Sequence, residues 1–287
     1  MEIWEGEFQP VNLSVIIITK NAASKIDQCL KSVKELGDEI LVLDTGSADN
    51  TINIAVRYGA KVSKSKGNNF SAWRNEAAKH AQGEWLFYID YDEEVTADLA
   101  KEISSIVGPV GSSSRPTSSK DVSAGALRDS LRSRHPLNLC AYKVPRKNYV
   151  FGKWLRHGGF WPDYVLRLMK KESLARWEGK LHEQPVINGE VGTLKNALIH
   201  HKEDSLSDMV EKTNRYSVFE AELLFKANHP SMAWWRFARI MSQELWYRLI
   251  VKGGILDGPE GILYGVYQMW SRFVTYVKLW EMQINNK

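Results

Sequence analysis

The first hundred residues alternate between strand and helix signals, and this alternation limits the fold more than any other feature of the sequence. Each expected strand is a short, apolar run that is often rich in β-branched residues, which is typical of strands buried on both faces of a parallel sheet. Repeated strand–helix units of this size imply an α/β fold with right-handed crossovers. The predicted strands are 13–19, 39–44, 61–63 and 85–90, and the predicted helices are 24–37, 49–58 and 69–82.

Polar residues gather where three of these strands end. Residues 19–21 (Thr-Lys-Asn) follow the first strand, 44–47 (Asp-Thr-Gly-Ser) the second, and 90–92 (Asp-Tyr-Asp) the fourth. Ligands of open α/β sheets bind at the carboxyl ends of the strands, so we expect a site at this edge. The chain has neither the glycine-rich dinucleotide fingerprint nor a phosphate-loop pattern, which argues against nicotinamide oxidoreductases and P-loop enzymes.

The remainder of the chain is less regular. The serine-rich segment 108–136 predicts a disordered insertion. Strands are expected again at 139–144, 164–169 and 194–200, and Ser205 with Asp208 predicts a capped helix that extends to about Ala227. We therefore expect four regions, with bounds 1–107, 108–136, 137–204 and 205–287.

The C-terminal region contains two apolar stripes at helical spacing, with basic residues beside them. Aromatic amphipathic helices of this kind can lie in a membrane interface. The alternative is that they pack on the rest of the molecule or form a dimer seam, because Trp also fills protein cores. The stripes are Trp234, Phe237, Met241, Leu245 and Leu249, then Leu263, Val266, Trp270, Phe273, Val277 and Trp280.

Composition excludes several other classes. The net charge is +4, and most of the basic excess lies in 108–136 rather than on an expected folded element, so a nucleic-acid partner is not expected. Two cysteines, Cys29 and Cys140, cannot form a disulfide framework, which favours a reducing, cytoplasmic location. No signal peptide and no membrane-spanning run are expected from the sequence.

The carboxylates at the strand ends suggest particular chemistry. Asp90 and Asp92 are two residues apart, and in extended backbone both would point the same way and address one hard cation. The alternative is a solvated strand end, because Glu93 and Glu94 follow. Asp44 lies before the expected helix cap and can accept a hydrogen bond from a base or a ribose, although a capped turn explains part of its loop.

The order of these segments resembles the family-2 glycosyltransferases. The resemblance rests on residues 14–21, 40–51, 72–76 and 83–93. One departure is Tyr91, where the family usually has a small residue, and its ring is expected to crowd the donor sugar. Segments 161–167, 177–183 and 198–201 further resemble the bacterial branch that includes lipopolysaccharide core β-1,4-glucosyltransferases.

This resemblance implies a GT-A fold, a nucleotide-diphosphate sugar donor such as a UDP-sugar, a divalent Mg²⁺ or Mn²⁺ ion, and inversion at the anomeric carbon. We expect a cell-envelope glycan or glycolipid as the acceptor. This lipid-bearing acceptor and the aromatic C-terminal helices together predict a peripheral position on the inner face of the cytoplasmic membrane. By motif, Asp44 would contact the nucleoside base, whose pocket Thr19 and Asn21 would line. Asp92 would ligate the metal, Asp90 would contact ribose or metal-bound water, and Arg74 would approach the donor, unless it is a helix-surface cation.

The later motifs suggest the remaining roles. Sugar transfer needs a base that takes the proton of the acceptor hydroxyl, and Glu183 is the candidate, with a surface ion pair to Lys180 as the alternative. His200 is a candidate metal ligand, although a structural role is equally compatible and His201 competes for it. Trp161, Asp163 and Arg167 are expected on the acceptor side, with a core position as the alternative for Trp161.

Two other functions fit parts of the sequence. A haloacid-dehalogenase-type phosphohydrolase also places an Asp-x-Asp at a strand end, with Asp90 as nucleophile and Asp92 as general acid. That class normally opens with this strand, whereas three strand–helix units precede it here. The second alternative is a non-catalytic, membrane-associated scaffold.

Overall fold

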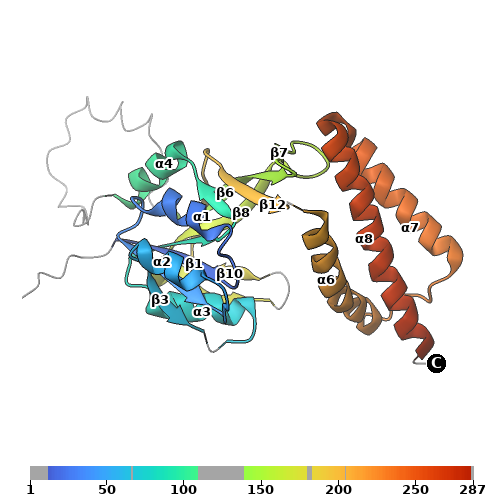
Figure 1. Ribbon diagram of the computed structural model, residues 1–287, viewed down its shortest axis with the longest axis horizontal. Coiled ribbons are helices and arrows are strands. Elements are labelled where there is room, and N and C mark those ends of the chain that lie inside the picture. The colour runs from blue at the N-terminus through green and yellow to red at the C-terminus, as the bar shows by residue number, and fades with distance from the viewer. Residues whose placement is uncertain (1–11, 66, 109–138, 180–182, 204, 286–287) are drawn as a thin grey trace, which may run out of the picture. The chain divides into compact units, whose positions relative to one another are not determined.

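The computed structural model describes residues 12–65, 67–108, 139–179, 183–203 and 205–285 (Figure 1). The chain forms two compact units, which we describe separately. The first unit contains the described residues up to Pro145 together with Tyr164–Leu198, and the second contains Arg146–Asp163 and the described residues from Ile199 onward. Of the predicted disordered insertion, 108–136, residues 109–136 lie outside the described residues.

The first unit is built on a mostly parallel sheet, as the sequence predicts. Its central strands are parallel neighbours, and an antiparallel strand joins them on one side. The α/β fold class is therefore confirmed. In spatial order the strands are β3 (Lys61–Lys64), β2 (Glu39–Asp44), β1 (Leu13–Thr19), β4 (Trp85–Asp90), the antiparallel β8 (Asp163–Lys170) and β6 (Leu139–Val150), with β11 (Glu190–Thr193) parallel to β6.

Helices cover both faces of this sheet (Figure 1). Alternate residues of β1 belong to different buried layers, because successive side chains of a strand point to opposite faces. Val15 and Ile17 pack in one buried cluster with helices α1, α2 and α4, whereas Ile16 and Ile18 pack in the other with α3. These helices are α1 (Ile26–Val33), α2 (Thr51–Arg57), α3 (Phe70–His80) and α4 (Ala97–Val107).

Helix caps show which local signals decide where a helix begins. Ser205 Oγ accepts a hydrogen bond from the Asp208 N–H at 3.1 Å, which confirms the predicted cap of α6 (Leu206–Lys226). The predicted capping box at Ser24 is wrong, because α1 begins at Ile26 and its cap residue, Lys25, makes no side-chain capping bond. There the N–H groups of Lys25 and Ile26 both donate to the carbonyl of Ala22 instead.

Short strands were missed by the sequence analysis. They include β5 (Glu93–Val95) and a two-stranded antiparallel sheet of β9 (Leu174–Glu178) and β10 (Gln184–Ile187). Strands of three to five residues carry too few alternations for a period of two to be recognised. This matters for function, since Glu183 lies immediately before β10.

The second unit is mainly helical. Helix α8 packs against both α6 and α7, and among the described residues no helix is both long and apolar enough to cross a membrane. Phe237 and Phe273 meet edge to face with ring centroids 5.8 Å apart, so parts of the predicted stripes form the seam between α7 and α8. The elements are β7 (Lys153–Trp154), β12 (Leu198–Glu203), α6, α7 (Trp234–Trp246), a π-helical turn (Tyr247–Val251), a 3-10 turn (Gly254–Asp257) and α8 (Gly258–Asn285).

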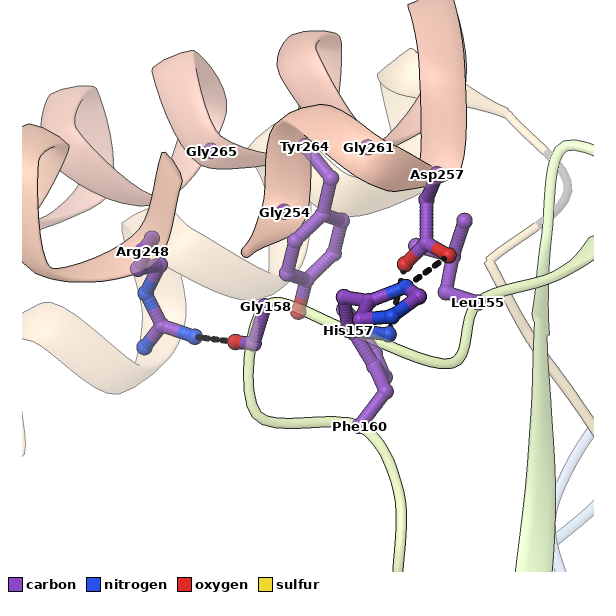
Figure 2. A pocket seen from close by; sticks show the side chains of 10 residues that line it. All are labelled: Leu155, His157, Gly158, Phe160, Arg248, Gly254, Asp257, Gly261, Tyr264 and Gly265. Atoms are coloured by element: carbon purple, nitrogen blue, oxygen red, sulfur yellow. Dashed lines mark hydrogen bonds and ion pairs between the residues drawn. The ribbon is translucent and has the colours of Figure 1, made fainter. Parts of the chain in front are cut away.

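A buried carboxylate, that of Asp257, is among the groups that line a small pocket in this unit (Figure 2). Asp257 accepts hydrogen bonds from the His157 ring Nδ1 at 2.9 Å, from the His157 N–H at 2.7 Å and from the Arg156 N–H at 3.1 Å. Burial by itself raises the pKa of the Asp257 carboxyl, but these hydrogen bonds outweigh burial and lower that pKa below its ordinary value. The contacts fasten the loop that follows β7 to the turn before α8.

We predict that Asp257→Asn destabilises the protein by about 1.5–3 kcal/mol near neutral pH, because it removes hydrogen bonds to a charged group. A lowered folded-state pKa contributes stability that is present above the unfolded-state pKa, about 4, and is lost as pH falls through the folded value. The stability difference between wild type and variant should therefore shrink as pH falls below about 4. Urea unfolding across this range measures it.

Glu281→Gln, an exposed carboxylate in the same unit, is the matched control and should leave the unfolding free energy nearly unchanged. A difference for Asp257→Asn that does not shrink below about pH 4 would contradict the assignment.

Candidate active site

The strand register brings the predicted site residues to one edge of the sheet. Thr19 at the end of β1 is paired with Asp44 at the end of β2. On the other side of β1, Ile18 is paired with Asp90 at the end of β4. Neighbouring strands lie about 4.8 Å apart, so the three strand ends form one continuous edge.

Two loops at this edge are hydrogen-bonded to one another. The Asp44 carboxylate is buried and accepts hydrogen bonds from the N–H groups of Gly46 and Ser47 at 3.1 Å. Asn21 has a left-handed backbone, with φ of 50°, and its side-chain oxygen accepts from the Ala48 N–H at 2.8 Å. The loops after β1 and β2 therefore hold each other, and Asp44 shapes its own turn as well as facing the edge.

Asp90 lies between two buried arginines. Arg74 on α3 donates from its terminal Nη2 to Asp90 Oδ1 at 3.1 Å. Arg167 on β8 donates to Asp90 Oδ2 from its own Nη2. The two arginine residues are 5% and 4% exposed, so Arg74 is not a helix-surface cation. Both carboxylate oxygens of Asp90 are thus occupied by guanidinium groups.

Each arginine also binds a second carboxylate. Arg167 Nη2 donates to Glu93 Oε1 at 2.7 Å, and Glu93 is fully buried. Arg74 Nε donates to Glu183 Oε1 at 3.3 Å, so the ionic partner of Glu183 in the described chain is an arginine of the site. Burial by itself lowers the pKa of the Arg167 guanidinium, but the charges of Asp90 and Glu93 outweigh it and raise that pKa above its usual value. We call these five residues, Asp90, Arg74, Arg167, Glu93 and Glu183, the ionic cluster.

Aromatic residues enclose the Arg74 side chain. Its guanidinium carbon lies 4.6 Å from the ring centroid of Trp177 and 5.6 Å from that of Tyr88. Asn75, the next residue of α3, fixes Trp177 by exchanging two hydrogen bonds of 2.8 Å with its backbone N–H and carbonyl. A guanidinium stacked on aromatic rings loses little freedom when it binds an anion.

The backbone around Asp92 differs from the expectation. β4 ends at Asp90, and Tyr91 and Asp92 form a turn before β5, so the prediction that extended backbone aligns the two carboxylates is wrong. Asp92 is partly exposed, and Tyr91 packs against the buried core of the first unit. Nearby, burial raises the pKa of the Cys29 thiol well above its usual value, and the charges of Glu93 and Asp92 act in the same direction. Cys29 is therefore a protonated core residue.

No group of three or more His, Cys, Asp and Glu side chains that could hold a metal ion occurs in the part of the chain that the structure describes. A magnesium ion, however, is commonly bound by one or two carboxylates together with substrate phosphates and waters. The partly exposed Asp92 fits that kind of site, whereas both oxygens of Asp90 already accept from arginines.

The second unit holds the other predicted residues. His200 is buried, and its ring Nδ1 lies 2.6 Å from Asn148 Oδ1. Asn148 in turn donates to Asp163 Oδ2 at 2.9 Å, and Arg146 donates to the same oxygen at 2.8 Å. Trp161 is 37% exposed and meets Trp154 edge to face. The metal role of His200 and the acceptor roles of Trp161, Asp163 and Arg167 stay predictions.

Several residues of these networks were missed from the sequence, and strand alternation contained the signal for two of them. In β5, Glu93 lies on the same face as the buried Val95, so it points inward rather than to solvent. In β6, Asn148 shares a buried face with Val144 and Val150 in the same way. A polar residue at an inward position of a strand is bonded to a partner, because an unpaired one is costly.

The chain is similar to proteins described as glycosyltransferases. Residues 14–106 match the family model of glycosyl transferase family 2, a segment that contains β1, β2 and β4. A protein of Rickettsia bellii described as an uncharacterized glycosyltransferase is 26% identical over 97% of this chain and 90% of its own length. A Synechococcus elongatus TPR repeat-containing protein is 40% identical over 32% of this chain and 23% of its own length.

Among solved structures, residues 1–349 of S. aureus TarS in complex with UDP-GlcNAc are 13% identical, with a TM-score of 0.41 over 96% of this chain and 92% of that chain. The predicted enzyme class, a glycosyltransferase, is confirmed by the family match and the relatives. The narrower resemblance to lipopolysaccharide core glucosyltransferases stays a prediction.

We predict that Arg167→Met destabilises the protein by about 3–5 kcal/mol, because it leaves the buried Glu93 without its cation. The double variant Arg167→Met/Glu93→Gln should recover a large part of this loss, since an amide carries no charge. Urea unfolding of the variants measures both values. Arg176→Met, which breaks an exposed ion pair with Glu178, is the control and should cost less than about 1 kcal/mol. A double variant no more stable than Arg167→Met would contradict this role of the cluster.

Proposed function

We propose that the chain is an inverting, metal-dependent glycosyltransferase of the GT-A type that transfers a sugar from a UDP-sugar to a cell-envelope glycan or glycolipid. One observation carries the proposal. The segment that matches glycosyl transferase family 2 is the one whose strand ends bring Thr19, Asp44 and Asp90 to a common edge. The proposed nucleotide site is this edge.

One unsatisfied polar group and one carboxylate with spare acceptor capacity support a nucleotide at this position. Thr19 Oγ1 is buried and has no hydrogen-bond partner among the described residues. Leaving such a group unpaired costs about 1–3 kcal/mol, and a base or ribose could satisfy it. Asp44 has acceptor capacity beyond the two N–H groups that it binds, since a carboxylate offers about four lone-pair sites. The loop bonds between Asn21 and Ala48 would keep this pocket in shape before the donor arrives.

The charge of the edge supports a requirement for a divalent cation. The carboxylates of the ionic cluster, together with Asp44 and Asp92, number five. They outnumber the two guanidinium groups and the two lysines at the same strand ends, Lys20 and Lys64, so these groups carry a net negative charge. A bare diphosphate would be repelled there. Asp92 would hold a Mg²⁺ or Mn²⁺ ion, which when bound offsets the charge that develops on the leaving diphosphate. Asp90, held by its two arginines, would contact ribose or the water shell.

Glu183 is the proposed general base. Its side chain is 17% exposed, and one oxygen accepts from Arg74, which places it beside Asp90. As the acceptor oxygen attacks the anomeric carbon, its bond to hydrogen weakens, and a carboxylate takes that proton late in the step. Attack from the face opposite to the leaving UDP breaks the glycosidic bond as the new one forms, which inverts the configuration.

Trp161 and Asp163 are the proposed acceptor-side residues. Trp161 offers a partly exposed aromatic face, which suits a sugar ring, and the Asp163 carboxylate is held by Arg146 and Asn148. A lipid-bearing acceptor would require a peripheral position at the inner face of the cytoplasmic membrane. The phosphohydrolase alternative is disfavoured, because its nucleophile would be Asp90 and both oxygens of that residue accept from arginines.

The test separates chemistry from binding. We predict that Glu183→Gln lowers the turnover of a UDP-sugar by about 10²–10⁴-fold, because the base is lost. The affinity for UDP should change by less than about threefold. Turnover is measured as UDP release from UDP-glucose, UDP-galactose and UDP-N-acetylglucosamine with core-truncated lipopolysaccharide as acceptor, and affinity by calorimetry.

Glu178→Gln, an exposed carboxylate on the neighbouring strand β9, is the matched control and should keep wild-type turnover. Full turnover by Glu183→Gln would refute its role as base. Absence of UDP binding by the wild type would overturn the donor assignment.

A further inference from the structure

Several apolar side chains of the second unit are exposed where α7 and α8 meet the turn between them. The first predicted apolar stripe is only partly exposed, because its last member, Leu249, lies against Gly265 of α8. Exposed apolar residues near this turn are Trp246 at 62% and Val251 at 60%, Leu256 of the 3-10 turn at 71%, and Leu263 of the predicted α8 stripe at 60%. We define the apolar tip as Trp246, Ile250, Val251, Leu256, Leu263 and Val266.

The backbone of the turn between α7 and α8 is closely packed through glycines, which Figure 2 labels. A Cβ on Gly261 would lie 2.2 Å from the carbonyl oxygen of Gly254, and one on Gly254 would lie 2.7 Å from that of Arg248. Arg248 also donates to the Gly158 carbonyl at 3.3 Å, and Asp257 binds His157. The end of the π-helical turn, the 3-10 turn and the start of α8 are thus held together, so the apolar side chains are presented on a fixed support.

The charges around the apolar tip are basic. The acids between Trp246 and Val266 are Asp257, which is buried, and Glu260, which pairs with Lys153 at 2.9 Å. Lys252 is exposed, and its carbonyl accepts from the Gly158 N–H at 2.8 Å. Arg156, also exposed, is placed beside the 3-10 turn by the bond from its N–H to Asp257. Exposed apolar side chains therefore lie among exposed cations.

We propose that the apolar tip docks on an anionic lipid bilayer, with its apolar side chains at headgroup depth and Lys252 and Arg156 against lipid phosphates. Amphipathic helical surfaces rich in aromatic and basic residues bind such interfaces. A second copy of the chain is the poorer occupant, because a symmetric contact would set the same cations against each other. The inference rests on the proposed function, since docking would bring the enzyme to a lipid-bearing acceptor.

The experiment is sedimentation of the full chain with vesicles of phosphatidylcholine, with or without about one quarter phosphatidylglycerol. We expect binding to the anionic vesicles that weakens in about 0.5 M salt. Leu256→Ser/Leu263→Ser should lower the vesicle affinity by about tenfold or more, and Lys252→Gln should weaken binding to anionic vesicles only.

The matched control is Val56→Ser/Leu223→Ser, which removes two apolar side chains of similar exposure, 58% and 56%, elsewhere on the chain. It should bind vesicles like the wild type. All variants are also titrated with UDP, and unchanged UDP affinity shows that the proposed active site is intact and folded. Loss of UDP binding with intact vesicle binding would count against the proposed function and leave the docking surface standing.

Three results would overturn the docking surface. The first is that the wild type does not sediment with anionic vesicles. The second is that the control variant loses as much vesicle affinity as Leu256→Ser/Leu263→Ser. The third is a dimer in analytical ultracentrifugation that Leu256→Ser/Leu263→Ser converts to monomer without changing vesicle binding, which would make the apolar tip a contact between copies of the chain.

Discussion

The position of Asp90 between Arg74 and Arg167 is the interaction on which the candidate site depends. It joins the end of β4 to α3 and to β8, and through Glu183 it reaches the start of β10. Buried ion pairs add little net stability, because removing charges from water costs about as much as their attraction returns. Their main effect is therefore on geometry. Separating a buried charge from its partner destabilises the fold, so the pairs hold their side chains in one arrangement.

The same network relates the site to the fold. Glu93 is buried behind the edge, where it accepts from the Asp90 N–H at 2.9 Å as well as from Arg167. The aromatic residues that flank Arg74 belong to the buried layer on the α3 side of the sheet. The core and the charged cluster thus share residues, so the side chains at the edge are preorganised before a ligand binds.

The sequence predicted this site unevenly, for physical reasons. The bounds of β1, β2 and β4 agree with the prediction, because each is a continuous apolar run that is buried along its length. Thr19, Asp44 and Asp90 were recognised because strand ends can be located from such runs. The partners of Asp90 were not recognised, because Arg167 is 77 residues distant and only the antiparallel pairing of β8 with β4 brings it near. Two predictions from local sequence were wrong. The helix cap predicted at Ser24 is absent, and the chain turns at Tyr91 and Asp92 instead of remaining extended.

The central claim is that a nucleotide diphosphate binds with a divalent cation at the carboxyl ends of β1, β2 and β4, and calorimetric titration with UDP tests it most directly. The wild type should bind UDP more tightly with Mn²⁺ than without it, and Asp92→Asn should lose the effect of the metal. Asp98→Asn, an exposed aspartate at the start of α4, should behave like the wild type. UDP binding that is independent of Mn²⁺, or unchanged in Asp92→Asn, would contradict the account.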